Sequence, residues 1–200
     1  MKLEGKRIGF AITSSFWAFN RTIDEIKKII KLGAQVMPIM SEISYTLDTK
    51  FGKASEFIQE IENITKTKVL HTILEVEYLG PKDMLDIMVV APATGNTIAK
   101  LANDIADGPV TMAVKSHLRK ERPVVIAVSA YDGLSSAGEN IGKLLNTKHY
   151  YFVPFRQDNP ITKPRSPVFV KIGFYSFYMS KPKYFSDCLL WGKNFKYISK

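Results

Sequence analysis

Short apolar segments alternate with amphipathic segments along most of the chain, and this alternation constrains its fold more than any other feature. The apolar segments have the length of strands and are rich in Val and Ile, without a polar residue at every second position. Strands that are apolar on both faces are typical of a parallel sheet between two helical layers. We therefore expect an α/β fold with three layers. The expected strands are residues 7–12, 34–40, 86–90, 123–129 and 149–155.

The segments between these strands have helical periodicity. In residues 20–33, Ile23, Ile26 and Ile30 fall on one face, Asn20 is a candidate N-cap and Gly33 ends the pattern. Similar patterns predict further helices at residues 54–65, 97–107, 110–119 and 138–146. The strands and helices follow one another as one domain, which we expect to span residues 1–167.

Three of the loops that follow the expected strands begin with a small hydroxyl residue, at Thr13, Ser41 and Ser129. In a parallel sheet these loops meet at the carboxyl edge, where ligands bind. Hydroxyls and free backbone amides at a helix N-terminus suit a phosphate, although such residues also serve as N-caps and turn formers. The first loop lacks G-x-G-x-x-G and G-x-x-x-x-G-K-[ST], so a mononucleotide is the simplest ligand.

Residues 91–102 read APATGNTIAKLA, and I-A-D follows at 105–107. This run resembles the P-A-S-A-N-T signature of the flavin-mononucleotide flavoproteins related to phosphopantothenoylcysteine decarboxylase. The resemblance covers roughly residues 4–167 and implies a Rossmann-like subunit with three layers that binds FMN and forms a homo-oligomer. It implies phosphate contacts from Thr13, Ser14 and Ser15, and flavin contacts from Ser41, Thr94, Gly95, Asn96 and Thr97. Ser129 is a weaker candidate for the same pocket.

Asn96 matches the signature asparagine that contacts substrate in the decarboxylases, and its alternative role is to cap the helix expected from Thr97. Two decarboxylase features are missing. Tyr78 stands where those enzymes have a histidine, and residues 110–116 contain no P-x-M-N motif. Decarboxylation is therefore less favoured than a second activity within the family.

Other motifs resemble a branch of the family that works with a separate dehydrogenase-like subunit. They include K-R-I-G-F at 6–10, L-G-P-K at 79–82 and P-F-R-Q-D at 154–158. The resemblance implies oxidation of a dihydropyridine dicarboxylate, with NADP available through the partner subunit. Lys115 and Arg165 are candidates to attract this small dicarboxylate, or they belong to a solvated face. A flavin-dependent decarboxylase and a non-catalytic scaffold or activating subunit remain alternatives.

The distribution of charge along the chain bears on whether the protein binds nucleic acid or a membrane. The net charge of +9 is inflated by residues 168–200, which hold six Lys against Asp187 alone, together with ten aromatic residues. We treat this tail as atypical: either a surface that docks a partner or a segment altered by a shifted reading frame. Binding of nucleic acid or membrane by the tail is less favoured.

Cysteine content and hydropathy exclude disulfide-bonded and membrane-spanning classes of protein. The single cysteine, Cys188, excludes an intrachain disulfide and favours a reducing, cytoplasmic compartment. No apolar run approaches the roughly 18 residues of a membrane span. No metal-binding motif is present, and we expect His71, His117 and His149 to be structural or solvated.

Overall fold

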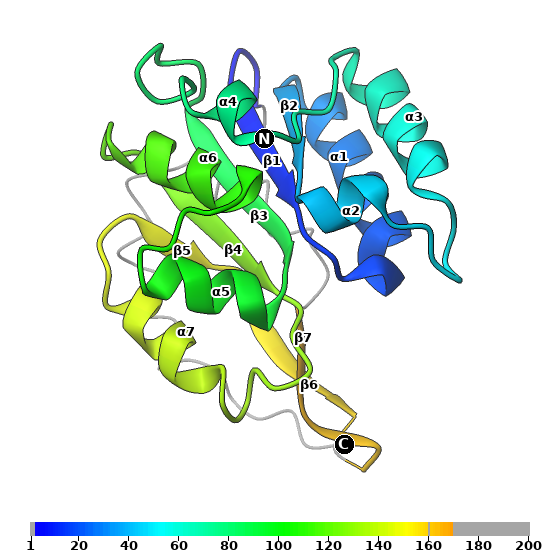
Figure 1. Cartoon of the computed structure of the whole chain (residues 1–200), viewed down its shortest axis with the longest axis vertical. Coiled ribbons are helices and arrows are strands. Elements are labelled where there is room, and N and C mark those ends of the chain that lie inside the picture. The colour runs from blue at the N-terminus through cyan, green and yellow to red at the C-terminus, as the bar shows by residue number, and fades with distance from the viewer. Residues whose placement is uncertain (1–2, 160, 170–200) are drawn as a thin grey trace.

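The computed structural model describes residues 3–159 and 161–169. Five parallel strands form one sheet in the order β2-β1-β3-β4-β5, which confirms the expected α/β class (Figure 1). Because β1 lies between β2 and β3, the strand order reverses there. The strands are β1 (Arg7–Ile12), β2 (Gln35–Met40), β3 (Ile87–Ala93), β4 (Val124–Val128) and β5 (Tyr150–Phe152).

Helices cover both faces of this sheet. On one face, α1 (Phe19–Lys31) and α3 (Ala54–Thr65) pack against β1 and β2. The opposite face is covered by α4 (Ile73–Val76), α5 (Gly95–Ala102), α6 (Pro109–Leu118) and α7 (Gly138–Leu145). Two short elements, the 3-10 helix η1 (Phe16–Ala18) and α2 (Glu42–Thr46), follow β1 and β2.

Alternate residues of the central strands supply two separate cores. In β3, Val89 packs with the α1 and α3 layer, while Met88 and Val90 pack with the α5, α6 and α7 layer. All three side chains are fully buried. Each such side chain contributes roughly 1.5–3 kcal/mol by leaving water, which explains why these strands carry no polar alternation.

A β-hairpin follows the sheet, made of β6 (Phe155–Asn159) and β7 (Lys163–Phe169), and it projects from the lower end of the molecule in Figure 1. The expectation of one strand over 149–155 is wrong, because β5 stops at Phe152 and Phe155 begins the hairpin. Pro154 lies between them and has no N–H to donate to a neighbouring strand. Two hydrogen bonds hold β7 to the loop after β4: Leu134 N to the Arg165 carbonyl, 3.0 Å, and Ser166 Oγ to the Tyr131 carbonyl, 2.9 Å.

Two helix boundaries differ from expectation. Helix α1 begins before Asn20, which lies inside it rather than capping it. The helix expected over 97–107 starts earlier, at Gly95, and ends at Ala102, because Asp104 takes a left-handed conformation with φ of 55°. Strand β7 continues past the domain boundary placed after residue 167. The rest of the predicted tail, residues 170–200, lies outside the described residues.

Four charged side chains close the amino edge of the sheet. Asp86 accepts hydrogen bonds from the Arg7 amide at 2.8 Å and from Arg7 Nη2 at 2.9 Å. Arg122 pairs with Asp83 at 2.8 Å and also donates to the Leu85 carbonyl. The hydrogen bond from the Arg7 side chain, opposed by partial burial, lowers the pKa of Asp86. We call these residues, Arg7, Asp83, Asp86 and Arg122, the amino-edge network.

His117 lies beside this network at the end of α6. The ring is buried, and Nε2 lies 3.2 Å from the Pro123 carbonyl. Burial lowers the pKa of His117 to about 4, so the ring is neutral at physiological pH. The expectation of a structural histidine agrees with this placement.

Candidate functional site

A hydroxyl-lined cavity of about 120 Å³ opens at the carboxyl edge of the sheet, where the strand order reverses. This is the position at which doubly wound sheets bind their ligands. The cavity brings together the loops after β1, β2 and β3, so two of the three hydroxyl loops predicted to meet, those of Thr13 and Ser41, line it and that of Ser129 does not. We call it the hydroxyl cavity, and its polar lining includes Thr13, Ser14, Ser41, Thr94, Asn96 and Thr97.

Most of these hydroxyls already hold the loops in place. Thr13 Oγ1 donates to the Pro92 carbonyl at 2.6 Å and accepts from the Thr94 amide at 3.1 Å, which ties the loop after β1 to the loop after β3. Thr94 caps α5 by accepting from the Thr97 amide, and the two threonine hydroxyls lie 3.0 Å apart. These contacts fix the shape of the cavity before any ligand arrives.

Two further serine pairs extend this framework. Ser41 caps α2 and lies 2.8 Å from Ser44, hydroxyl to hydroxyl. Ser15 and Ser129 form a buried pair at 2.8 Å that joins the loop after β1 to the loop after β4. Ser129 therefore contacts the loop after β1 through Ser15. Ser129 does not line the hydroxyl cavity.

Ser14 and Asn96 differ from the other polar residues of the hydroxyl cavity. Within the described part of the chain, neither side chain has a hydrogen-bond partner. Asn96 is the second residue of α5, and Thr94 is the N-cap, so the alternative capping role of Asn96 is wrong. The amides of Gly95 and Asn96 also have no acceptor within the helix. Uncommitted donors therefore face the cavity from two loops.

Three charged residues also line the hydroxyl cavity: Glu42, Lys100 and Asp107. Lys100 Nζ contacts both carboxylate oxygens of Asp107 at 2.9 Å, and its hydrogen bond lowers the pKa of Asp107. Glu42 is the second acidic residue of the lining. The one lysine of the lining is thus already paired, so an anion would be held by neutral donors.

Gly95 allows two loops to meet at this edge. A Cβ at this position would lie 2.8 Å from Asp132 Oδ1, in the loop after β4. A larger residue would require the Asp132 side chain to shift. The glycine of the signature therefore leaves room for this side chain beside the start of α5.

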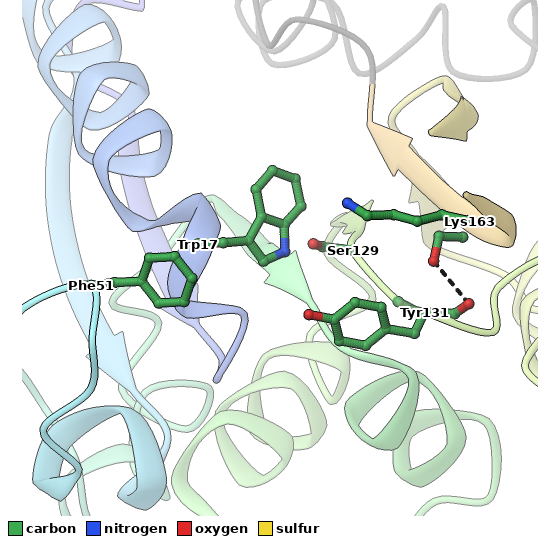
Figure 2. A pocket seen from close by; sticks show the side chains of 7 residues that line it. Trp17, Phe51, Ser129, Tyr131 and Lys163 are labelled. Atoms are coloured by element: carbon green, nitrogen blue, oxygen red, sulfur yellow. Dashed lines mark hydrogen bonds between the residues drawn. The ribbon is translucent and has the colours of Figure 1, made fainter. Parts of the chain in front are cut away.

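A second cavity, of about 220 Å³, lies between the loop after β1 and the β6–β7 hairpin (Figure 2). We call it the ring cavity. Figure 2 shows Trp17, Phe51 and Tyr131 around it, with the Lys163 ammonium group directed toward Trp17 and Ser129. Ala130 and Ser166 complete the lining.

Sequence reasoning did not identify the three aromatic residues of the ring cavity. They come from segments far apart in the chain and follow no common spacing. The signal that could have found them is their exposure as large side chains in loops after strands: Tyr131 is 77% exposed and Phe51 is 46% exposed. Such exposure becomes evident only once the fold is known.

The two candidate substrate cations lie elsewhere. Lys115 pairs with Asp104 at 3.0 Å. Arg165 accepts from the Leu134 amide through its carbonyl. Neither residue lines the hydroxyl cavity or the ring cavity. The geometry thus gives no support to the substrate roles predicted for them.

Two other groups of residues bear on the expected chemistry. Tyr78, at the position of the decarboxylase histidine, lines neither cavity, and the Lys82 ammonium lies 4.5 Å from the centre of its ring. Among residues 3–159 and 161–169, no cluster of three His, Cys, Asp or Glu side chains could hold a metal ion. The helices of this described part include none with the length and hydropathy of a membrane span.

Comparison with known proteins extends these observations. The chain is 42% identical to the B subunit of dipicolinate synthase from Bacillus subtilis over 166 residues, which is 83% of each protein. The crystal structure of the corresponding B subunit from Bacillus halodurans superimposes with a TM-score of 0.78 at 39% identity, covering 95% of this chain and 94% of that one.

A more distant relative is the coenzyme A biosynthesis bifunctional protein CoaBC from Thermococcus kodakarensis. The two sequences are 33% identical over 72% of this chain, and the match covers only 35% of that longer protein. The family model described as Flavoprotein matches residues 1–155. The chain therefore belongs to the Flavoprotein family, and its similarity to the B subunit of dipicolinate synthase extends over most of its length.

Proposed function

We propose that this chain acts as an FMN-binding B subunit of dipicolinate synthase. In this role it works with the dehydrogenase-like A subunit of that enzyme to oxidise a dihydropyridine dicarboxylate to pyridine-2,6-dicarboxylate. The observation that carries the proposal is the pair of uncommitted side chains, Ser14 and Asn96, in a preformed cavity where the strand order reverses. The 42% identity to the Bacillus subtilis protein supports the choice of reaction.

The residues of the hydroxyl cavity fit the phosphate of FMN. A phosphate needs several donors, and the Ser14 hydroxyl with the side-chain and backbone amides of Asn96 can provide them without a cation. Thr13, Ser15, Ser41, Thr94 and Thr97 keep these donors in position through their own hydrogen bonds. When bound, FMN would supply an acceptor for two electrons.

The oxidation removes two hydrogens from the substrate, one as a hydride and one as a proton, and leaves an aromatic ring. No nucleophile is needed, so the chain contributes position and electrostatics. Asn96, which lines the hydroxyl cavity, would orient the substrate. NADP, held by the A subunit, is a second possible destination for the hydride. We also propose, from the resemblance given above, that the protein is a homo-oligomer in the mother-cell cytoplasm of a sporulating bacterium.

The test is to measure pyridine-2,6-dicarboxylate formation by the isolated A subunit, by this protein on its own and by the mixture. We expect product only from the mixture, together with a flavin absorbance band in the purified protein or after adding FMN. Product formation by the mixture with a protein that takes up no FMN would instead identify a scaffold or activating subunit. Release of CO₂ from a cysteinyl substrate would identify a decarboxylase.

A further inference from the structure

Glu42 is a third residue of the hydroxyl cavity whose side chain is uncommitted. Its carboxylate has no hydrogen bond or ion pair within the described part of the chain, and only its backbone carbonyl is engaged, by Thr46 Oγ1 at 2.8 Å. Ser14 and Asn96 are the other two. The hydroxyl cavity therefore offers a free carboxylate beside a free hydroxyl and a free carboxamide.

The strand order determines how these three residues are arranged. Glu42 is the first residue of α2, directly after β2, and Asn96 lies in α5, directly after β3. Because β1 lies between β2 and β3, Ser14 comes from the middle loop, and Glu42 and Asn96 come from the loops on either side of it. A ligand in the hydroxyl cavity thus lies between the loop of Glu42 and the loop of Asn96.

The backbone that carries Glu42 is fixed on both sides. Ser41 caps α2 by accepting from the Ser44 amide at 3.3 Å, and the two serine hydroxyls lie 2.8 Å apart. The Ser41 amide donates to the Ile12 carbonyl at 3.0 Å, which ties the start of α2 to the end of β1. The carboxylate therefore extends from a fixed point beside the hydroxyl cavity.

The proposed oxidation needs a group that accepts a proton. A hydride leaves one carbon of the dihydropyridine ring for the two-electron acceptor of the enzyme, flavin or NADP, and a proton leaves another ring atom. The electron pair that bound this proton stays in the ring and completes its aromatic system. A carboxylate or an imidazole within hydrogen-bond reach of the substrate can take the proton.

Glu42 is the best candidate for this role among the residues of the two cavities. The other carboxylate of the hydroxyl cavity, Asp107, is bound by Lys100, which lowers the pKa of Asp107 and makes it a weaker base. Of the described residues that line the ring cavity, none is Asp, Glu or His. A negatively charged ligand beside Glu42 would make its carboxylate a stronger base.

We propose that Glu42 is the catalytic base of the oxidation. Its carboxylate takes the proton from the dihydropyridine ring as the hydride leaves, becomes a carboxylic acid and then passes the proton to water. This inference deepens the proposed function and rests on it for the reaction. Asn96 orients the substrate from one side of the hydroxyl cavity, and Glu42 accepts the proton from the other.

The first test measures product formation by variants mixed with the A subunit. Glu42→Gln keeps the size of the side chain but cannot accept a proton, so we expect kcat to fall at least about 100-fold and KM to change less than about threefold. Glu42→Asp keeps a carboxylate and should retain at least about one tenth of kcat. The decrease in kcat toward acidic pH should be absent in Glu42→Gln. Glu56→Gln is the matched control, because Glu56 is an exposed glutamate in the first turn of α3 that lines neither cavity.

A binding measurement gives a readout that does not depend on turnover. Pyridine-2,6-dicarboxylate is titrated into the full chain by calorimetry, in mildly acidic buffers that differ in ionisation enthalpy and contain no divalent cations, because the probe chelates them. We expect binding to take up protons in the unaltered chain and in Glu56→Gln, and fewer in Glu42→Gln, since an anion favours the protonated form of a neighbouring carboxylate. The affinity for FMN should not weaken in Glu42→Gln.

The two measurements distinguish this inference from the proposed function. If the unaltered mixture makes product and Glu42→Gln keeps its kcat, the function stands and Glu42 is not the base. A rise in KM alone would identify a residue that only binds substrate, and it would also overturn the proposal. If the unaltered mixture makes no product, the proposed reaction is wrong. Proton uptake that is lost in Glu42→Gln would then still place Glu42 against the bound anion, whereas unchanged uptake would overturn that placement as well.

Discussion

The two edges of the sheet use polar residues in opposite ways. At the amino edge, Arg7, Asp83, Asp86 and Arg122 pair with one another, and His117 is buried beside them. At the carboxyl edge, hydroxyls fix the loops and leave Ser14, Asn96 and a group of aromatic faces available. One edge satisfies its polar groups internally and stabilises the fold, while the other leaves donors for a ligand. Changes at the amino edge should therefore affect stability, and changes at the carboxyl edge should affect binding.

The largest expected effect is at Gly80, in the turn that leads to the amino end of β3. A Cβ there would lie 1.8 Å from the Ser116 carbonyl oxygen, a backbone atom that cannot move aside. We expect Gly80→Ala to lower the free energy of unfolding by about 4 kcal/mol or more, measured by urea denaturation. Gly142→Ala is the control, because its Cβ meets nothing within 4 Å in α7 and should raise stability by up to about 1 kcal/mol. Similar midpoints for the two variants would contradict this expectation.

The next effect is the pH dependence that His117 imposes. Its pKa is about 4 in the folded protein and near 6.5 when exposed, so the unfolded chain takes up a proton first as pH falls. Stability is therefore full above pH 6.5 and decreases between 6.5 and 4, by about 3 kcal/mol in all. His117→Gln should reduce this loss when unfolding is compared at pH 7.5 and 4.5. An unchanged difference between the two pH values would show that the ring is not buried in its neutral form.

A smaller loss is expected from Asp86→Ala in the amino-edge network. The change removes the acceptor for the Arg7 amide and side chain and for Arg122, and we expect about 2 kcal/mol less stability at pH 7. Because Arg7 lowers the pKa of Asp86, the contribution is present above the unfolded pKa and is lost as pH falls through the folded value. Affinity for FMN should not change. A loss of FMN binding in the folded variant would break the contrast between the edges.

The smallest effect on stability belongs to Asn96→Ala at the carboxyl edge. Because the side chain has no partner within the described residues, the free energy of unfolding should change by less than about 0.5 kcal/mol. Product formation by the mixture with the A subunit should fall about tenfold, which corresponds to about 1.4 kcal/mol in the transition state. Asn146→Ala, at the end of α7 and outside both cavities, is the control. Normal turnover in Asn96→Ala would show that this residue does not orient the substrate.

Local sequence patterns predicted the sheet, because a strand that is buried on both faces is a continuous apolar run of neighbouring residues. The apolar run over 123–129 became β4, and the hydroxyl residues predicted after β1, β2 and β4, which are Thr13, Ser41 and Ser129, lie at one edge as parallel strands require. The hairpin was not predicted, because the F-R-Q-D-N segment of β6 is mostly polar and β7 contains two prolines. Its strands pair with each other, and its position against the sheet comes from contacts with the loop after β4, which no local pattern encodes.

The hydroxyl cavity could be predicted from the sequence, as the sheet could, whereas the ring cavity, like the hairpin, could not. Thr94, Gly95, Asn96 and Thr97 form one continuous motif, so the sequence alone could identify it. The ring cavity needs Trp17, Phe51, Tyr131 and Lys163 from four separate segments, and only the folded chain brings them together. Arg7 and Asp86 were missed for the same reason, since 79 positions separate them.

The buried Ser15–Ser129 hydrogen bond stands between the loop that lines the hydroxyl cavity and the loop that lines the ring cavity. A change that displaces either serine therefore shifts both loops at once, so the shapes of the two cavities are linked through this hydrogen bond.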